Sequence, residues 1–416
     1  MKVLIVGKGG REHAIAWKVK ESDLVKEIFI APGNIGMESL GTLINIPEEK
    51  IEELADFAQK NKIDLTIVGP ENVLALGIVN EFERRGLKIF GPTKEAAKIE
   101  SSKEFAKKLM KKYGVPTGDY ETFTDLELAV KYVEEKGAPI VIKEDGLKAG
   151  KGVTVAFSIP EAIEALEVAF SIPNNKVVIE EYLDGFEFSI IALTNGETVI
   201  PLEIAQDHKR AYDNDEGPNT GGMGVYSPVD KIDSNVIDET LEKILKPMAK
   251  GMAKDGISFK GFLFGGIMLT KDGVKTIEFN ARFGDPEAEG ILPRLKSDFV
   301  KAILDLMENK DVDLEWDDRY TVAVVMASEN YPKSSTIGSE IEIPKDLESV
   351  VFHMGTRKVH GKIETNGGRV LSVVAYGNTL EEAKKNAYLD VKKINCKKLF
   401  FRNDIGSKMC YNNENK

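Results

Sequence analysis

Short apolar strands alternate with amphipathic helices over the first hundred residues, and this order constrains the fold more than any other feature of the chain. The apolar runs predict strands at residues 2–6, 27–30, 65–68 and 88–90. The periodicity between them predicts helices at residues 12–20, 48–61 and 74–85. Strands that are joined by helices run parallel, and the helices cover both faces of the sheet. Residues 1–100 are therefore predicted to form a doubly wound α/β domain.

The rest of the chain predicts three further units, at residues 101–192, 193–322 and 323–416. A chain of 416 residues is too long for one hydrophobic core. The second unit mixes strands and helices in an α+β pattern and opens with a helix capped near Ser102. The last unit is rich in strands and carries one helix. We therefore expect a multidomain protein of α/β and α+β units.

Local patterns place several elements inside these units. A capping box beginning at Thr124 predicts a helix that runs to Gly137. The third unit predicts a long polar loop at residues 207–224, a helix at 239–255 and hairpin strands at 261–269 and 274–283. These last two strands matter most for function, because polar residues recur along the second of them.

The strand at residues 276–283 has one apolar and one polar face, because side chains alternate along a strand. The apolar face carries Ile277, Phe279, Ala281 and Phe283. The polar face carries Glu278, Asn280 and Arg282. Carboxylate and amide oxygens suit a hard divalent cation, and a guanidinium suits a phosphate or carboxylate. A half-exposed strand facing water explains the same alternation equally well.

The glycine-rich segment at residues 7–13 joins the first strand to the first helix. Its backbone amides could approach an anion at a helix N-terminus. It fails the dinucleotide fingerprint, because Glu12 takes the third glycine position and no acidic residue ends the second strand. A sugar-phosphate site is favoured over NAD, and a plain glycine turn is the alternative.

A second glycine-rich segment, at residues 143–153, follows a buried strand that ends in Lys143. It lacks the spacing of a Walker loop. A cationic loop that closes over polyphosphate is favoured, because lysine is unusual at the end of an apolar strand. A solvated hairpin is the alternative.

Composition excludes several classes of function. The net charge of −12 argues against nonspecific nucleic-acid binding, and no apolar run is long enough to span a bilayer. Two cysteines and four histidines offer neither a disulfide framework nor zinc-ligand spacing. A reducing cytoplasm is the expected compartment.

These segments, in this order, resemble the phosphoribosylamine–glycine ligase family of ATP-grasp enzymes, and the resemblance runs nearly end to end. Further matching motifs lie at residues 67–71, 91–93, 206–210, 217–224 and 365–370. The resemblance implies an ATP-grasp fold with four parts. They are an N-terminal α/β domain (1–100), a small lobe with its lead-in helix (101–192), a large lobe (193–322) and a strand-rich C-terminal domain (323–416).

The resemblance also implies residue roles. The ATP-binding residues would be Lys103, Lys143, Gly150, Lys151, Gly152, Glu181, Leu183 and Glu187. The metal ligands for magnesium, or for manganese, would be Glu278 and Asn280. The catalytic residues would be Arg282 and Asp285. The substrate-binding residues would be Gly9, Gly10, Arg11, Glu12, Asn34, Glu71, Lys209, Arg210, Asn219, Gly221, Gly222 and Glu287.

The activity implied is the ATP-dependent ligation of glycine to 5-phosphoribosylamine through glycyl phosphate, in purine biosynthesis, by a cytoplasmic monomer. Three alternatives stay open. The chain could be another ATP-grasp ligase or carboxylase, an NAD-dependent oxidoreductase, or a nucleotide sensor without catalysis.

The chain departs from the expected pattern at five places. Glu144 and Lys148 stand where the family usually has small or apolar residues, and Glu289 stands where it usually has glutamine. Residues 171–175 form a shorter segment than usual, so the loop of the small lobe is expected to close differently. The strand at 261–269 carries no acid, so the metal site is expected to draw on ATP oxygens and water.

Overall fold

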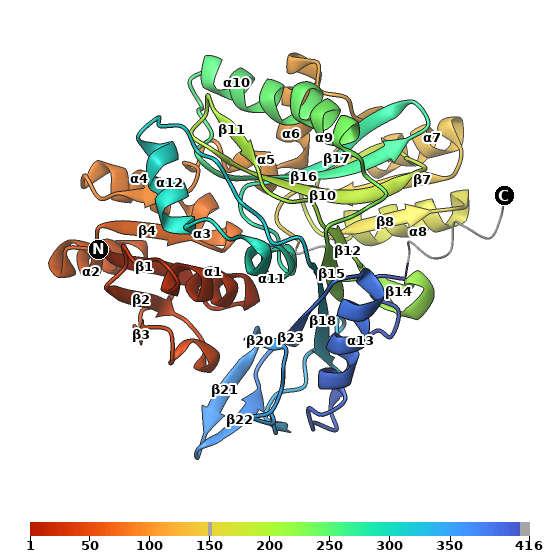
Figure 1. The fold of residues 1–416 in the computed structure, drawn as a ribbon. Coiled ribbons are helices and arrows are strands. Elements are labelled where there is room, and N and C mark those ends of the chain that lie inside the picture. The colour runs from red at the N-terminus through yellow and green to blue at the C-terminus, as the bar shows by residue number, and fades with distance from the viewer. Residues whose placement is uncertain (149–151, 408–416) are drawn as a thin grey trace.

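The computed structural model describes residues 1–148 and 152–407. Its N-terminal part is a five-stranded parallel sheet with the order β3-β2-β1-β4-β5, which confirms the predicted doubly wound domain (Figure 1). The strands are β1 (Lys2–Gly7), β2 (Glu27–Pro32), β3 (Thr42–Leu43), β4 (Leu65–Val68) and β5 (Ile89–Phe90). The helices are α1 (Gly10–Lys20), α2 (Ile51–Asn61), α3 (Glu71–Leu76) and α4 (Ile78–Arg84).

The prediction of a single helix at residues 74–85 is wrong. The structure has two short helices, α3 and α4, which are separated at Gly77. Gly77 has a φ of 97°, a left-handed conformation that is open to glycine and ends α3. Helix α3 begins at Glu71, soon after β4 ends at Val68, so this carboxylate stands at the carboxyl edge of the parallel sheet.

The second part is an antiparallel sheet with the order β6-β9-β7-β8. Its strands are β6 (Tyr120–Phe123), β7 (Ile140–Glu144), β8 (Val153–Ala156) and β9 (Val177–Glu181). Its helices are α5 (Lys98–Ser101), α6 (Lys103–Tyr113), α7 (Leu126–Lys136) and α8 (Ile159–Phe170). Ser102 caps α6 as predicted, with its hydroxyl accepting from the amide of Phe105. The cap of α7 is Asp125 rather than Thr124, so the predicted capping box is one residue out of register.

The third part is a sheet with the order β11-β10-β16-β17. Its strands are β10 (Phe186–Thr194), β11 (Val199–Pro201), β16 (Gly261–Thr270) and β17 (Gly273–Asn280). One face is covered by α9 (Ser234–Thr240), a π-helical turn (Leu241–Leu245) and α10 (Lys246–Lys254), which follow one another directly (Figure 1). The helix predicted at 239–255 thus begins five residues earlier, after the Asp233 cap.

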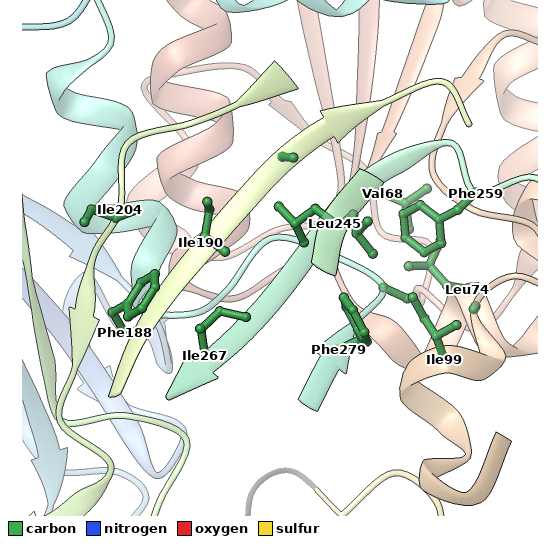
Figure 2. Close-up of a cluster of buried hydrophobic side chains, with 14 of the residues drawn as sticks. Val68, Leu74, Ile99, Phe188, Ile190, Ile204, Leu245, Phe259, Ile267 and Phe279 are labelled. Carbon is green, nitrogen blue, oxygen red and sulfur yellow. The ribbon is translucent and has the colours of Figure 1, made fainter. Parts of the chain in front are cut away.

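Large apolar side chains fill the space between this sheet and its neighbours. Figure 2 shows Phe188, Ile190 and Ile267 on the sheet, and Ile190 and Ile267 lie with Leu245 of the π-helical turn around Gly265. All four are fully or almost fully buried. On the other side of Leu245, Phe279 of β17 approaches Ile99 of α5. Val68 and Leu74 belong to the same cluster, so the core is shared between the large sheet and the N-terminal part, and it fixes the strand that carries Glu278.

The C-terminal part is built on a sheet that draws strands from two distant regions of the chain. The path β12-β15-β18-β23-β20 joins β12 (Gln206–Asp207) and β15 (Gly224–Ser227) to β18 (Tyr320–Ser328), β23 (Arg369–Gly377) and β20 (Val350–His353). Helix α13 (Leu380–Val391), capped by Thr379, packs on β23 and β18. Smaller elements complete this part: β19 (Glu340–Ile341), β21 (Thr356–Val359), β22 (Lys362–Thr365) and β24 (Leu399–Phe400).

The prediction of a long loop at residues 207–224 is therefore wrong. Besides the ends of β12 and β15, this segment holds the hairpin β13 (Arg210–Tyr212) and β14 (Glu216–Asn219), with a 3-10 turn at Asp213–Asp215 between them. Within the segment β13 pairs with β14, and β12 pairs with β15, while Gly224 at its end also pairs with Val324 of β18. The boundary expected after residue 322 falls inside β18, and we keep the four-part division as a proposal.

The second hairpin strand also differs from its prediction. β17 ends at Asn280, so Arg282 lies just beyond it. A β-bulge opposite Gly266 and Ile267 shifts the alternation at Ile277. Thr276 is consequently buried and Ile277 only half-buried. From Glu278 onward the predicted alternation holds, because Phe279, Ala281 and Phe283 are buried.

The segment after β17 returns the chain to the C-terminal part. It contains α11 (Glu287–Ile291), a 3-10 turn (Leu292–Arg294) and α12 (Phe299–Met307). Over residues 1–148 and 152–407, no helix combines the length and apolar character that crossing a membrane requires.

Leu245→Ala should lower the free energy of unfolding by about 2–5 kcal/mol, because it leaves a cavity in the core beneath the large sheet. The matched control is Leu389→Ala on α13, whose side chain is 53% exposed and should tolerate the change. Urea unfolding followed by intrinsic fluorescence measures both variants. Equal midpoints for the two variants would contradict the shared core.

Candidate active site

A cavity of about 580 Å³ lies where the two ATP-grasp-like sheets, the N-terminal part and the C-terminal part meet. Its walls come from α6, β7 and the connection between β9 and β10 on one side. The opposite walls come from β17, the residues that follow it and the β13–β14 hairpin. The hairpin also reaches the small lobe, since the Asn219 side chain donates to the Val153 carbonyl at 3.3 Å.

Most of the residues singled out from the sequence line this cavity. They are Lys103, Lys143, Gly152, Glu181, Leu183, Glu187, Arg11, Glu71, Lys209, Arg210, Asn219, Gly221, Glu278, Asn280, Arg282, Asp285 and Glu287. Gly9 and Glu12 line a second cavity of about 320 Å³, which Arg11 and Asp285 share. Gly10, Asn34 and Gly222 line neither, and Gly150 and Lys151 lie outside the described residues.

Buried lysines occupy the end of the cavity near the small lobe. The Lys143 ammonium lies 2.9 Å from the Glu180 carboxylate and donates to the Ile277 carbonyl at 2.9 Å. The Lys107 ammonium lies 2.8 Å from the same carboxylate, and burial lowers the pKa of Lys107 to about 8. Burial also lowers the pKa of Lys103, whose ammonium donates to the Gly146 carbonyl at 2.9 Å. The three lysines gathered at this end favour an anionic ligand such as a polyphosphate.

Glu278 and Asn280 offer their oxygens to the middle of the cavity. Burial favours the neutral form of Glu278, but Lys209, Lys143 and Lys103 hold the pKa of this carboxyl below its usual value. The Lys209 ammonium lies 3.9 Å from Glu278 and pairs with Glu187. Across the described residues, no group of three or more His, Cys, Asp or Glu side chains forms a ready metal site. An ionised carboxylate beside an amide oxygen still fits a hard cation that keeps water or phosphate ligands.

A chain of alternating charges holds Arg282. Its guanidinium lies 3.2 Å from Glu71 of α3 and 3.0 Å from Glu100 of α5. Burial raises the pKa of Glu100 to about 7, despite the opposing charge of Arg282. Burial also acts to raise the pKa of Glu71, but the positive charges of Arg282 and Arg11 outweigh this effect and lower the pKa to about 2. Arg282 is thus buried, charged and fixed at the edge of the cavity.

The side chain of Glu12 occupies the space inside the first glycine-rich segment. The Glu12 carboxylate accepts from the Gly9 amide at 2.6 Å and from the Arg11 guanidinium at 2.6 Å. A Cβ at Gly7 or Gly69 would collide with Glu12, so these glycines make room for it. The Asn34 amide donates to the carbonyls of Lys8 and His353, at 2.7 and 2.8 Å. Glu12 and Asn34 therefore shape this turn, and the Gly9 amide is already engaged.

The departures from the family pattern are connected to one another in the small lobe. The Lys148 ammonium lies 2.7 Å from the Glu144 carboxylate, which also accepts from Asn175 at 2.9 Å. Two of the unusual residues thus pair with each other and tie down the shortened segment at 171–175.

Glu289 is the remaining departure. It is fully buried against Gly10, and neither carboxylate oxygen has a hydrogen-bond partner among the described residues. Burial, with the nearby Asp285, raises the pKa of Glu289 well above its usual value. Burial thus favours the neutral acid, which has the shape of glutamine, the residue that the resemblance led us to expect here.

Several cavity residues escaped the sequence reasoning. Lys107 could have been found, because it stands four residues after Lys103 on the helix face that carries Ala106 and Met110. Arg369 lies in a matching motif but had no assigned role. It donates to the Gly221 and Asp285 carbonyls, at 2.6 and 2.7 Å, from the C-terminal part. Glu100 carries no signal in the local sequence.

The two sheets that enclose a lysine-lined cavity, with Glu278 and Asn280 on the facing hairpin, define an ATP-grasp protein. Three family models cover most of the chain: the phosphoribosylglycinamide synthetase N domain (residues 1–100), ATP-grasp (A) domain (101–288) and C domain (321–408). The chain belongs to the phosphoribosylglycinamide synthetase family.

Individual proteins agree with this assignment. A phosphoribosylamine–glycine ligase from Halalkalibacterium halodurans is 49% identical, over 98% of this chain and 97% of that protein. The crystal structure of phosphoribosylamine–glycine ligase from Thermotoga maritima matches with a TM-score of 0.85 at 35% identity, covering 97% of this chain and 100% of that one. The biotin carboxylase domain of the Hydrogenobacter thermophilus 2-oxoglutarate carboxylase shares the fold, with a TM-score of 0.71 at 16% identity over 96% and 91% of the two chains.

Proposed function

We propose that this protein ligates glycine to 5-phosphoribosylamine and consumes ATP, as an enzyme of purine biosynthesis. One observation carries the proposal: in a chain of this family, a single cavity holds the Lys103 and Lys143 cations, the Glu278 and Asn280 oxygens, and Arg282. An oxidoreductase needs none of this arrangement. We further propose that the protein is cytoplasmic and acts as a monomer.

The reaction needs activation, because a carboxylate does not acylate an amine at neutral pH. A glycine carboxylate oxygen attacks the γ-phosphorus of ATP, and ADP leaves, giving glycyl phosphate. The amine of 5-phosphoribosylamine then attacks the acyl carbon, phosphate leaves, and the amine gives up one proton as the amide forms. No side-chain nucleophile takes part, so the protein's contribution is positioning and charge neutralisation.

Each part of the cavity has a role in this scheme. Lys103 and Lys143 would neutralise the ATP phosphates, and Arg282 would stabilise the oxygens of the transferring phosphoryl group and of the acyl phosphate. Glu181 and Leu183 would contact the adenine, and Glu187 the ribose. Glu278 and Asn280 would hold magnesium, or manganese, which when bound supplies positive charge to the phosphate oxygens. Arg11 and Glu71 would face the phosphoribosylamine.

The proposed activity is tested by measuring ADP release with glycine and freshly prepared 5-phosphoribosylamine, and by omitting each in turn. Release that depends on both substrates is expected. Bicarbonate-dependent release would instead support a carboxylase, and no release under any condition would support a sensor.

Glu278→Gln should abolish nearly all ligation while the protein stays folded, because an amide is a weaker ligand for magnesium than a carboxylate. Turnover in a magnesium titration measures this, with the exposed Glu197→Gln as a matched control. Turnover close to that of the unmodified protein at saturating magnesium would remove Glu278 from the metal site.

Arg282→Ala should lower kcat by about 10²- to 10³-fold while the KM for ATP changes little, because the guanidinium acts on charge that develops during the reaction. Steady-state kinetics separates the two parameters. A melting curve checks the fold, since the change leaves Glu100 and Glu71 without Arg282. A defect seen only in the KM for ATP would exclude the proposed role.

A further inference from the structure

The β13–β14 hairpin lines the main cavity but has little support of its own. Among the described residues, its two strands pair only with each other. Residues 214–218 at its tip are exposed, and Asn214 and Asp215 have φ values of 60° and 55°. Residues other than glycine seldom adopt this left-handed conformation. An isolated two-stranded hairpin is at best marginally stable, so contacts from outside must hold this one in place.

Residues 399–406, which we call the C-terminal strap, supply such contacts. The Arg402 side chain is only 1% exposed and lies 2.9 Å from the carboxylate of Asp215, at the tip of the hairpin. The same guanidinium donates to the carbonyl of Arg210 in β13 at 3.1 Å. Asp404 pairs with it at 2.7 Å and fixes its orientation. One buried cation therefore holds both the tip and the first strand of the hairpin.

The neighbouring residues of the strap add hydrogen bonds to the turn between β13 and β14. Asn403 donates twice to the Asp213 carboxylate, from its backbone amide at 2.7 Å and from its side-chain amide at 2.9 Å. The Asp404 carboxylate accepts from the backbone amide of Asn214 at 2.9 Å. These bonds reach the left-handed part of the backbone and stabilise it.

The strap is itself anchored to the C-terminal part. Its first residues form β24, which pairs with β18. The Tyr388 hydroxyl of α13 donates to the Arg402 carbonyl at 2.7 Å and accepts from the Ile405 amide at 3.1 Å. The Ile405 side chain is fully buried, beside Gly224 of β15. This apolar side chain therefore packs on the sheet, whereas the polar side chains of the strap face the hairpin.

The hairpin carries side chains that belong to the cavity. Lys209 precedes β13, Arg210 begins it and Asn219 ends β14, and all three line the cavity. Asn219 also reaches Val153 of the small lobe, so the hairpin spans the wall from the C-terminal part to that lobe. None of residues 399–406, all of which the structure describes, lines either cavity. The strap thus acts on the site through the hairpin.

We propose that the C-terminal strap holds the hairpin against the cavity, and that Arg402 and Asn403 are positioning residues that act through it. The consequence for catalysis rests on the proposed function. Glycyl phosphate is hydrolysed where water reaches it, so the wall of the cavity has to stay in place until the amine has attacked. A fixed hairpin keeps ATP cleavage coupled to amide formation.

Asn403→Asp tests the contact at an exposed position, where the change leaves the core intact. It replaces a hydrogen-bond donor with a carboxylate that faces Asp213, and the two like charges repel each other. Hydrogen exchange of the backbone amides at residues 210–219 should become about tenfold faster, while the other protected amides keep their rates. Salt screens exposed charges, so this effect should shrink as the ionic strength rises from about 0.1 M to about 1 M.

The same variant should loosen the coupling of the reaction. In the unmodified protein, each ADP released should be matched by one amide formed. In Asn403→Asp, ADP release should exceed amide formation, and the KM for ATP should rise by about 3- to 10-fold because the cavity wall is less fixed. Arg402→Gln should act in the same direction and more strongly, since it leaves Asp215 and Asp404 without their shared cation.

A second substitution should restore the contact. Adding Asp213→Asn to Asn403→Asp exchanges the donor and the acceptor, so the hydrogen bond between the side chains can form again without repulsion. Exchange rates, coupling and the KM for ATP should return to within about twofold of the unmodified protein. Arg357→Gln is the matched control, since it breaks a surface ion pair with Glu364 on the β21–β22 hairpin and should change none of these.

Four results would overturn the proposal: unchanged hydrogen exchange at residues 210–219 in Asn403→Asp, equally faster exchange throughout the protein, a double variant as impaired as the single one, or amide formation that still matches ADP release when the hairpin exchanges faster. Absence of ADP release by the unmodified protein would instead remove the proposed function. The exchange rates, together with ATP affinity from calorimetry, would then still decide whether the strap holds the hairpin.

Discussion

The ion pairs of Arg282 bring the parts of this protein together. Glu71 comes from the N-terminal sheet, Glu100 from the short helix that leads into the small lobe, and Arg282 from the segment after β17. A buried guanidinium must be paired, and each buried carboxylate needs its cation in turn. Because the partners belong to different sheets, the charges can be satisfied only when these sheets are packed together. The cavity is the space that this packing leaves.

Charge is distributed unevenly inside that cavity. Lysines gather near the small lobe, where Lys107 and Lys143 both pair with Glu180 and Lys103 lines the same cavity. The opposite wall holds the carboxylates Asp207 and Glu287. The proposed reaction uses an anionic polyphosphate, which suits the end lined by lysines.

The unusual residues of this chain show how a family pattern tolerates change. Glu144 and Lys148 each place a charge where a small or apolar residue is usual, and the two charges cancel in one ion pair. Asn175, at the end of the shortened segment, bonds the same carboxylate. Glu289 is accommodated in another way, because burial favours its neutral form and its shape is that of glutamine. Electrostatic balance is preserved in both cases.

Local patterns were sufficient for the elements that depend on local physics. The periodicity of residues 1–100 predicted a parallel α/β domain, and Ser102 was correctly predicted to cap a helix. Alternation along one strand also predicted that Glu278, Asn280 and Arg282 lie on the side opposite the buried Phe279, Ala281 and Phe283. Errors arose where a backbone detail intervened, at the Gly77 break and at the bulge beside Ile277.

Tertiary structure alone decided which side chains meet. The 207–224 segment looked like a loop because its strands are only two to four residues long and lie among glycines. Glu100 had no visible role until Arg282 was packed against it. The sequence by itself determined the chemical inventory of the site, namely which strand would carry oxygens and which loops would carry lysines. It could not determine the pairing of charges, because pairing depends on distances between residues that only the assembled sheets bring together.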